Sequence, residues 1–318
     1  MIIKYSQIIT IGSGPSSYTF SIYAVRSNLN IIIISGKNLG GQLTKTNIIE
    51  NWPSTTKIGG RDLMLNFYDQ ALKFNIEIYI DEVYSIDLLT NPFIVFSKKF
   101  FFIFEFLIIC TGSFHKILKL KNQNKYIGKN ISNCSICDGN FFLKKKIIIL
   151  GGGDSCFENL NYLLNISKNI ILINRNKIFK CNFDLIKKAF FKSYLFLKLK
   201  INYYILEFIG DDYSLKYIKI KNFYNFCVKI IYIDALFIFI GNIPNSKLFK
   251  GQLRLNKNYI LTKKSSDYNS LKTSINKILC AGEVQDFLYK QAITSSSSGC
   301  VAYFDLLKLY KKFFYKNV

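Results

Sequence analysis

One stretch near the N-terminus sets the fold class: Gln7-Ile-Ile-Thr-Ile-Gly12-Ser-Gly14-Pro-Ser-Ser17. Its apolar first half is typical of a buried strand, and residues 18–27 have the pattern of a helix. A strand that enters a helix through a glycine turn is typical of a dinucleotide-binding unit. Gly12 permits the tight turn, and Gly14 lets backbone N–H groups approach a pyrophosphate at the helix N-terminus, where the helix dipole favours negative charge. The third glycine of the motif is replaced by Ser17, which is small enough for close helix–strand packing.

The same arrangement recurs later as Lys146-Ile-Ile-Ile-Leu-Gly151-Gly-Gly153-Asp-Ser-Cys156, followed by a helix-like segment at 157–164. The first glycines of the two motifs are 139 residues apart, and each motif lies between a strand and a helix. Two independent copies imply that the chain binds two dinucleotides. The chemistry that needs two of them in one chain is electron transfer from a nicotinamide to a flavin. We therefore predict an α/β fold with two Rossmann-like dinucleotide-binding domains.

The donor is indicated by the end of the second strand of the later unit. An acidic residue about 20 residues after the glycine motif binds the ribose of NAD, whereas a basic residue there accommodates the extra phosphate of NADP. Residues 170–173 have the pattern of that strand, and Arg175 follows it, with Lys180 shortly after. Because the chain has only four arginines, one at this position favours NADPH. A solvated arginine at a strand end is the alternative interpretation.

A cysteine motif, Cys134-Ser-Ile-Cys137-Asp138-Gly, lies between the two glycine motifs. If it opens a helix, with Asn133 at the capping position, the two cysteines lie on one face and are close enough to form a disulfide. A zinc site needs a second Cys or His pair, but the other cysteines lack that spacing and His115 is the only histidine. A redox-active pair is the better interpretation, and we expect no metal. Asp138 adds a carboxylate that can move the proton accompanying a two-electron step.

Composition excludes several classes of protein. With 318 residues, 50% hydrophobic and 20% charged, the chain suits two ordinary domains and is too apolar to be mainly disordered. No apolar run approaches the roughly 18 residues of a membrane helix. No signal peptide is recognisable, so we expect a cytoplasmic protein with no membrane partner. The net charge of +23 comes from lysines scattered along the chain, whereas a nucleic-acid reader concentrates arginine, so we expect no nucleic-acid partner.

Further motifs occur in the order found in one family. They are Gly12-Ser-Gly14-Pro, Gly40-Gly-Gln42-Leu43, Glu50-Asn-Trp-Pro53, Thr111-Gly112, the cysteine motif, Gly151-Gly-Gly153, Gly241-Asn-Ile-Pro244-Asn245, Ala281-Gly-Glu283 and Gln291-Ala292-Ile-Thr. Through them the sequence closely resembles the low-molecular-weight, bacterial-type thioredoxin reductases along nearly its whole length. The cysteine motif separates this family from fold relatives that have both nucleotide sites but no disulfide.

The resemblance implies a particular division of the chain. An FAD domain would consist of residues 1–114 and 243–318, and an NADPH domain of residues 115–242 would be inserted between them. The implied FAD contacts are Gly12, Gly14, Pro15, Gly36, Lys37, Gly40, Gly41, Gln42, Leu43, Asn51, Thr111, Gly112, Gly282, Glu283, Gln291 and Ala292. The implied NADPH contacts are Gly151, Gly153, Asp154, Ser155, Arg175, Lys180 and Gly241.

The resemblance also implies an activity. In this family hydride passes from NADPH to FAD, the reduced flavin opens the disulfide of the cysteine motif, and the dithiol reduces the disulfide of thioredoxin. By position, Cys137 is expected to face the flavin, Cys134 to attack thioredoxin and Asp138 to act as acid/base. One domain must rotate against the other, because the dithiol has to meet both flavin and thioredoxin. The family forms homodimers, so a homodimer is expected here.

Two departures from the family bear on the cofactors. The usual basic cluster for the 2′-phosphate is here Asn174-Arg175-Asn176, with Lys180 in place of a further arginine, which weakens the expected preference for NADPH. Glu283 replaces the Asp of the flavin motif, so its hydrogen bond to the ribityl chain must shift or recruit a water.

Three rival interpretations remain. The first is a related flavin disulfide reductase that uses NADH or ferredoxin as donor, or a peroxiredoxin-type protein as acceptor. The second is a non-enzymatic flavin- or nucleotide-binding module, and the third is RNA binding through the basic surface, which would show a steep salt dependence.

Overall fold

The computed structural model describes residues 2–46, 48–193, 196–263 and 270–314, and the chain divides into two compact units. Unit 1 consists of Met1–Phe114 and Ile243–Val318, and unit 2 of His115–Asn242. The chain leaves unit 1 through strand β7 (Ser113–His115) and returns through β16 (Asn242–Pro244), and these two short strands pair with each other.

Unit 1 is built on a seven-stranded mixed sheet. Its strand order is β3-β2-β1-β6-β5-β4, and β19 also pairs with β6. The strands are β1 (Ile2–Ile11), β2 (Ile31–Ile34), β3 (Glu77–Tyr79), β4 (Val83–Asp87), β5 (Phe93–Ser97), β6 (Phe100–Ile109) and β19 (Ile278–Cys280). The pairs among β1, β2, β3, β6 and β19 are parallel, whereas β4 and β5 are antiparallel additions. All four isoleucines of β2 are buried, as expected of a parallel strand covered on both faces.

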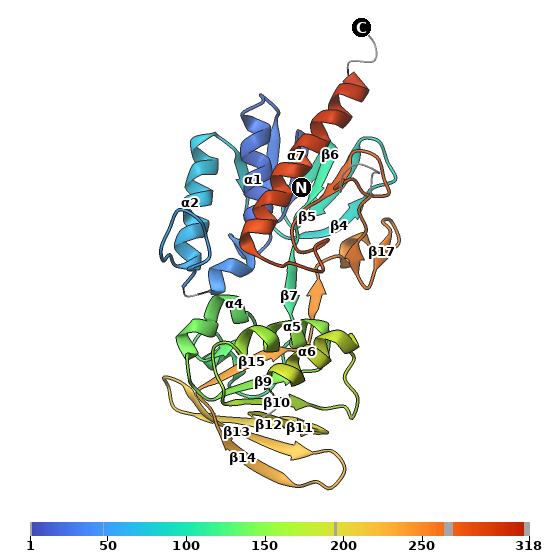
Figure 1. Cartoon of the computed structure of the whole chain (residues 1–318). Helices are drawn as coiled ribbons and strands as arrows, with labels where there is room; N and C mark the ends of the chain where they lie inside the picture. Colours follow the sequence, from blue (N-terminus) through green and yellow to red (C-terminus); the bar gives the residue numbers. More distant parts are fainter. Residues whose placement is uncertain (1, 47, 194–195, 264–269, 315–318) are drawn as a thin grey trace. The chain divides into compact units, whose positions relative to one another are not determined.

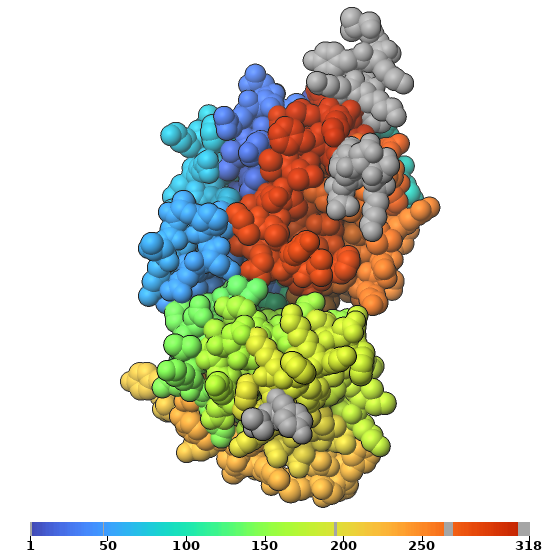
Figure 2. Space-filling model, in the orientation of Figure 1, coloured from blue at the N-terminus to red at the C-terminus, as the bar shows by residue number. Residues whose placement is uncertain are grey.

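The helices of unit 1 pack on this sheet. They are α1 (Pro15–Val25), α2 (Gly60–Lys73) and α7 (Ala292–Phe314), with short 3-10 turns η1 (Gly41–Lys45) and η3 (Lys247–Phe249) and a small hairpin of β17 (Leu255–Asn256) and β18 (Tyr259–Ile260). Helices α1 and α7, from opposite ends of the chain, lie side by side (Figures 1 and 2).

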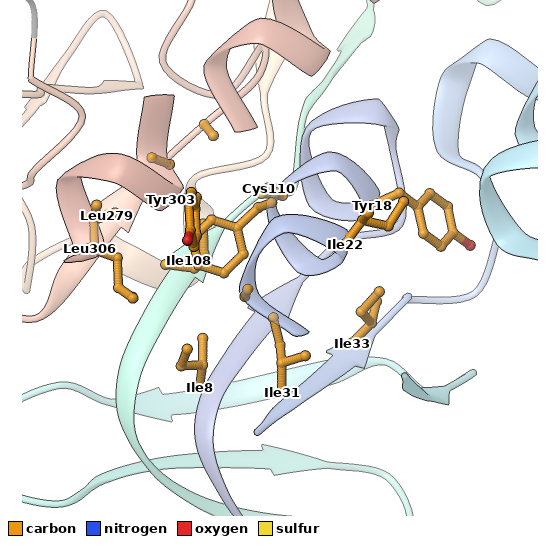
Figure 3. Packing of buried hydrophobic residues seen from close by; sticks show 14 of the residues in the cluster. Ile8, Tyr18, Ile22, Ile31, Ile33, Ile108, Cys110, Leu279, Tyr303 and Leu306 are labelled. Carbon is orange, nitrogen blue, oxygen red and sulfur yellow. The ribbon is translucent and has the colours of Figure 1, made fainter. Parts of the chain in front are cut away.

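One core cluster joins these helices to the sheet. Ile8, Ile31 and Ile108 of the strands share this cluster with Tyr18 of α1 and Tyr303 of α7 (Figure 3). Burial of such side chains stabilises a fold by about 1.5–3 kcal/mol each. The cluster therefore fixes the start of α1, and with it the first glycine turn, against the end of the sheet.

Unit 2 is a second, smaller α/β unit. Its parallel sheet has the order β11-β10-β9-β15-β8. The strands are β8 (Ile131–Ser132), β9 (Ile147–Gly151), β10 (Ile170–Asn174), β11 (Leu197–Ile201) and β15 (Ala235–Phe239), and the helical segments are α3 (Gln123–Tyr126), α4 (Ser135–Asp138), η2 (Gly139–Phe142), α5 (Asp154–Leu163) and α6 (Phe183–Ser193).

Different elements pack on the two faces of this sheet. Ile147 and Ile149 of β9 point to a cluster that includes Phe157 of α5, whereas Ile148 points to the opposite face. That face is covered by an antiparallel sheet of β12 (Tyr203–Gly210), β13 (Leu215–Asn222) and β14 (Val228–Tyr232), the yellow and orange strands of Figure 1. Alternation along β9 therefore explains why the strand is apolar at every position.

The predicted α/β class with Rossmann-like cores is confirmed. The helix starts differ from the prediction, because α1 begins at Pro15 rather than residue 18 and α5 at Asp154 rather than residue 157. Both helices start directly after the last glycine of their turn, and proline suits the first helical position because its missing N–H has no partner there. Within the described ranges no helix is long and apolar enough to cross a membrane.

Candidate functional site

The first glycine turn connects β1 to α1 in unit 1. Gly12 has a φ of +116°, and a Cβ built on it would lie 2.2 Å from the carbonyl oxygen of Cys110, so only glycine fits. Gly14 differs, since it has a φ of −81° and a Cβ there would meet nothing within 4 Å. Helix α1 begins at Pro15 without a side-chain cap. Pro15 has no N–H, and the Ser17 N–H donates to the Gly14 carbonyl over 3.1 Å, so the Ser16 N–H is the one in this first turn that is open to an anion.

The loop after β2 lies against this turn. The Gly40 N–H donates to Ser13 Oγ over 3.0 Å, and a Cβ on Gly41 would lie 3.7 Å from the Cα of Gly14. The two segments therefore pack closely, backbone against backbone, at the start of α1. Lys37 of the same loop is exposed and pairs with Glu82 at 3.1 Å.

The remaining residues predicted for FAD come together from distant parts of unit 1. Gln42 Nε2 donates to the Ser113 carbonyl over 2.8 Å, and Ser113 Oγ donates to Glu283 Oε2 over 2.6 Å. Asn51 Nδ2 donates to Gln291 Oε1 over 3.3 Å, at the start of α7. Gln42, Asn51, Glu283 and Gln291 come from four separate motifs, and the fold joins them in two hydrogen-bonded groups.

Thr111 and Glu283 complete this arrangement. Thr111 Oγ1 donates to the Asn245 carbonyl, and Asn245 Nδ2 donates back to the Thr111 carbonyl, each over 2.8 Å. Burial raises the pKa of Glu283, partly offset by the hydrogen bond from Ser113 and the charge of Lys290. Ser113 was not predicted from the sequence, because its partners are 71 and 170 positions away.

The other residues predicted for FAD occupy structural positions around the site. Gly282 donates its N–H to Ser298 Oγ over 2.8 Å, and Leu43 packs against the hydrophobic core. Gly36 and Gly112 turn the chain with φ of +78° and +66°, and Ala292 is the first residue of α7.

The second glycine turn, in unit 2, repeats the geometry of the first. Gly151 has a φ of +154°, and a Cβ there would lie 2.4 Å from the Phe239 carbonyl oxygen. Helix α5 follows with Gly153 as its N-cap residue and no side-chain cap. The Cys156 and Phe157 N–H groups donate to the Gly153 carbonyl, and the earlier Ser155 N–H is open to a phosphate. Asp154 Oδ1 accepts from the Asn182 N–H over 2.7 Å, which ties the segment after β10 to the helix start.

The basic residues predicted for the donor lie beside this turn. The Lys180 N–H donates to the Gly152 carbonyl over 2.7 Å, and Arg175 is exposed directly after β10. Asn174 is buried, and its Nδ2 donates to the Asn176 carbonyl over 2.9 Å, so Asn174 shapes the turn. The exposed Lys177 adds a third basic side chain that sequence reasoning did not name.

Ser155 and Gly241 are the last residues predicted for the donor. The Ser155 carbonyl accepts from Asn159 Nδ2 within α5, over 2.7 Å. Gly241 lies just beyond β15, whose residue Phe239 pairs with Gly151, and its carbonyl accepts from the Lys116 N–H over 2.9 Å.

Cys134 and Cys137 form a disulfide, with their Cα atoms 5.3 Å apart. The predicted cap at Asn133 is wrong, because Cys134 itself is the N-cap residue of α4 and its Sγ accepts from the Cys137 N–H over 3.2 Å. An N-cap residue needs an extended backbone and an acceptor aimed at the first turn, and Cys134 provides both. Each cysteine is half-buried.

Asp138 lies one residue beyond the disulfide and is half-buried. Ser132 Oγ donates to Asp138 Oδ2 over 2.5 Å and accepts from the Cys134 N–H over 3.0 Å. Burial raises the pKa of Asp138, and the hydrogen bond from Ser132 only partly opposes this effect. Asp138 can therefore hold a proton at a pH where an ordinary carboxyl group has lost it.

The helix that carries the disulfide is also tied to the helix that follows the second glycine turn, since Ser135 Oγ of α4 hydrogen-bonds Asn159 Oδ1 of α5. Unit 2 thus combines a disulfide, a carboxyl group with a raised pKa and a nucleotide-type turn. Across the described residues, no group of three or more His, Cys, Asp or Glu side chains is placed to hold a metal ion.

Comparison with known proteins places these features in context. Residues 6–299 match the family described as pyridine nucleotide-disulphide oxidoreductase. A thioredoxin reductase of Buchnera aphidicola subsp. Schizaphis graminum is 39% identical over 95% of this chain and 96% of its own length. A glucosaminate ammonia-lyase of Pseudomonas fluorescens is 34% identical over 95% of each chain. The solved structure of a thioredoxin reductase from Giardia duodenalis superposes with a TM-score of 0.89 at 29% identity, covering 96% of this chain and 99% of that one.

Proposed function

Because the chain belongs to the pyridine nucleotide-disulphide oxidoreductase family and, within it, to the thioredoxin reductases, we propose that it reduces thioredoxin with electrons from NADPH, passed through FAD and the Cys134–Cys137 pair. The observation that carries this proposal is the disulfide beside Asp138. A lyase reaction transfers no electrons and would give these residues no role.

FAD is proposed to bind in unit 1. The α1 N-terminus fits its pyrophosphate, because the space beside Gly14 is open: a Cβ there would meet nothing within 4 Å. Gln42, Thr111 and Glu283 lie further along the same site and offer hydrogen-bonding groups to the rest of the cofactor.

NADPH is proposed to bind in unit 2. The α5 N-terminus and Gly153 suit its pyrophosphate, and Arg175 with Lys180 would hold the 2′-phosphate. When bound, the two cofactors supply a two-electron hydride relay from the nicotinamide to the flavin.

The cysteines then carry the electrons to the protein substrate. Two electrons and a proton convert the disulfide to one thiolate and one thiol, and the N–H of Cys137 aimed at Cys134 Sγ favours the thiolate on Cys134. That thiolate attacks a sulfur of the thioredoxin disulfide and forms a mixed disulfide, while the other thioredoxin sulfur leaves as a thiolate. Cys137 then attacks Cys134, which releases reduced thioredoxin and restores the disulfide. Asp138 is the group proposed to move the accompanying protons.

The surface beside the disulfide suits a protein substrate. Ile136, Phe141 and Leu143 are all exposed, with Ile136 at 47%. Exposed apolar side chains close in sequence to a reactive group suit a protein-docking surface. This feature supports thioredoxin, rather than a small disulfide, as the acceptor.

Two further expectations belong to this proposal. A homodimer is supported by the exposed apolar side chains of Tyr23 on α1 and of Val301 and Phe304 on α7, where Tyr23 and Phe304 stack edge-on at 6.3 Å. Sedimentation of the intact chain at twice its monomer mass would support it. Action in the cytoplasm is supported by six free cysteines, which suit a reducing compartment.

Anaerobic mixing tests the proposed reaction. The FAD-loaded protein is mixed with NADPH, or separately with NADH, and bleaching of the flavin absorbance is followed before oxidised thioredoxin is added. Bleaching by NADPH and recovery with thioredoxin are expected. Bleaching by NADH alone would assign another donor, and a flavin that stays bleached after thioredoxin is added would assign another acceptor.

A further inference from the structure

The hydrogen bond between Ser113 and Glu283 joins two parts of unit 1 that the proposed chemistry does not otherwise connect. Ser113 is 2% exposed and is the first residue of β7, along which the chain leaves the unit. Glu283 follows the glycine turn at Gly282, in a motif proposed to bind FAD. A buried hydroxyl aimed at a carboxylate at 2.6 Å is a strong, charge-assisted contact.

Ser113 is held from two sides. Its carbonyl accepts from Gln42 Nε2 over 2.8 Å, and the preceding residues are clasped by Asn245, whose N–H donates to the Gly112 carbonyl over 2.9 Å. The backbone that carries the Ser113 hydroxyl is consequently held by groups other than Glu283. A glutamate has three rotatable bonds and loses considerable entropy when it is ordered, so a fixed donor decides where its carboxyl group lies.

The length of Glu283 makes this contact possible. An aspartate on the same backbone would be shorter by one C–C bond, about 1.5 Å, and its oxygen would stop about 4 Å from Ser113 Oγ. That distance is beyond hydrogen-bond range. In the described part of unit 1, Ser113 provides the one hydrogen bond found for the Glu283 carboxylate.

From this geometry we propose that Ser113 is a positioning residue, which holds the Glu283 carboxyl group in place to bind FAD and ties it to the strand where the chain leaves unit 1. The inference rests on the proposed binding of FAD. It extends that proposal by assigning a role to a residue outside the cofactor motifs, and it accounts for a glutamate where the resembling family has aspartate.

Affinity for FAD in the apo form of the full chain is the first test. Titration with FAD, followed by quenching of flavin fluorescence, should show S113A and E283D each raising the Kd about tenfold. The double variant S113A/E283D should be no weaker than either single variant, because both remove the same contact. E283Q keeps the length and the acceptor oxygen, so its loss should be smaller than that of E283D.

The matched control is S270A. Ser270 Oγ also donates to a buried carboxylate in unit 1, that of Asp305 at 3.0 Å, but neither residue belongs to a cofactor motif. S270A should therefore bind FAD as the natural protein does. A similar loss of FAD affinity in S113A and S270A would show that the effect of S113A is general destabilisation, and would overturn the proposal.

The pH dependence of FAD affinity supplies a readout that a merely structural role would not move. Affinity should fall as Glu283 becomes protonated. The hydrogen bond from Ser113 favours the carboxylate, so S113A should raise the pKa of Glu283 and shift the loss of FAD affinity to higher pH. The other charged and titratable groups near Glu283, which are Lys290, Asp286 and Tyr259, are the same in S113A. E283Q should lose this dependence altogether.

The possible failures are distinguishable. A natural protein that does not bind FAD would refute the proposed function itself. Tight FAD binding by the natural protein, with S113A unchanged in both affinity and pH profile, would refute the role of Ser113 alone. Additive losses in the double variant would likewise refute it.

Discussion

Gly12 and Gly14 belong to one motif, but the structure predicts opposite results when each is replaced by alanine. At Gly12 the new Cβ would lie 2.2 Å from the Cys110 oxygen, about 1.2 Å closer than ordinary contact at 3.4 Å. The φ of +116° adds about 1–2 kcal/mol for any L side chain, and displacing a packed backbone adds about 1–3 kcal/mol. We expect G12A to lower the free energy of unfolding of unit 1 by about 3 kcal/mol.

At Gly14 the backbone suits any residue, and the space around it is open. G14A should leave the apo protein as stable as before, or more stable by about 0.5 kcal/mol, because alanine restricts the unfolded chain. The added methyl group would, however, stand where the pyrophosphate is proposed to lie. Loss of one hydrogen bond to a charged group is worth about 2 kcal/mol, so we expect FAD to bind about thirtyfold more weakly.

Both quantities are measurable on the same preparations. Trp52 is the only tryptophan and lies in unit 1, where its ring packs edge-on against Phe67 at 5.6 Å, so its fluorescence in urea reports the unfolding of that unit. FAD affinity follows from titration of the apo protein. Unfolding of G14A as readily as G12A, or an FAD affinity of G14A equal to that of the natural protein, would refute the predicted difference between the two glycines.

Three further predictions concern unit 2. D138N should slow thioredoxin reduction by about a hundredfold. The rate of the natural protein should fall as pH rises through the raised pKa of Asp138, because the group then loses its proton and cannot donate it, and D138N should abolish this fall. A pH–rate profile measures both effects, and an unchanged profile would contradict the role of Asp138. C137S should accumulate a mixed disulfide with thioredoxin that C134S does not form, visible on a non-reducing gel, and the opposite pattern would exchange the roles of the two cysteines. In steady-state assays, the double variant R175A/K180A should raise the KM for NADPH about tenfold and leave the KM for NADH unchanged, because these side chains bind only the 2′-phosphate. Equal changes in the two KM values would show that Arg175 and Lys180 do not bind the 2′-phosphate.

Local sequence patterns were sufficient to predict the two glycine turns. Gly12 and Gly151 stand between an apolar strand and a helix, and the structure shows both with positive φ and a carbonyl oxygen where a Cβ would lie. Such a turn is determined by neighbouring residues, so the sequence reveals it directly. The pairing of Cys134 with Cys137 could be predicted from the sequence for the same reason, because the two residues are three positions apart.

Contacts between residues far apart in the chain could not be predicted from the sequence. Ser113 meets a partner 170 positions away, and nothing around residue 113 indicates it. The antiparallel sheet of β12, β13 and β14 was also missed, because its strands lie outside both glycine motifs. The cap at Cys134 was assigned to Asn133 on general preference, whereas the backbone conformation at this site makes the sulfur the acceptor.

The central claim is that electrons pass through the Cys134–Cys137 pair, and anaerobic reductive titration of the FAD-loaded protein tests it most directly. The natural protein should take up twice as many electron equivalents per flavin as the double variant C134S/C137S, because flavin and disulfide each accept one pair. Equal uptake by the two proteins would show that the disulfide does not exchange electrons with the flavin, and would contradict the account.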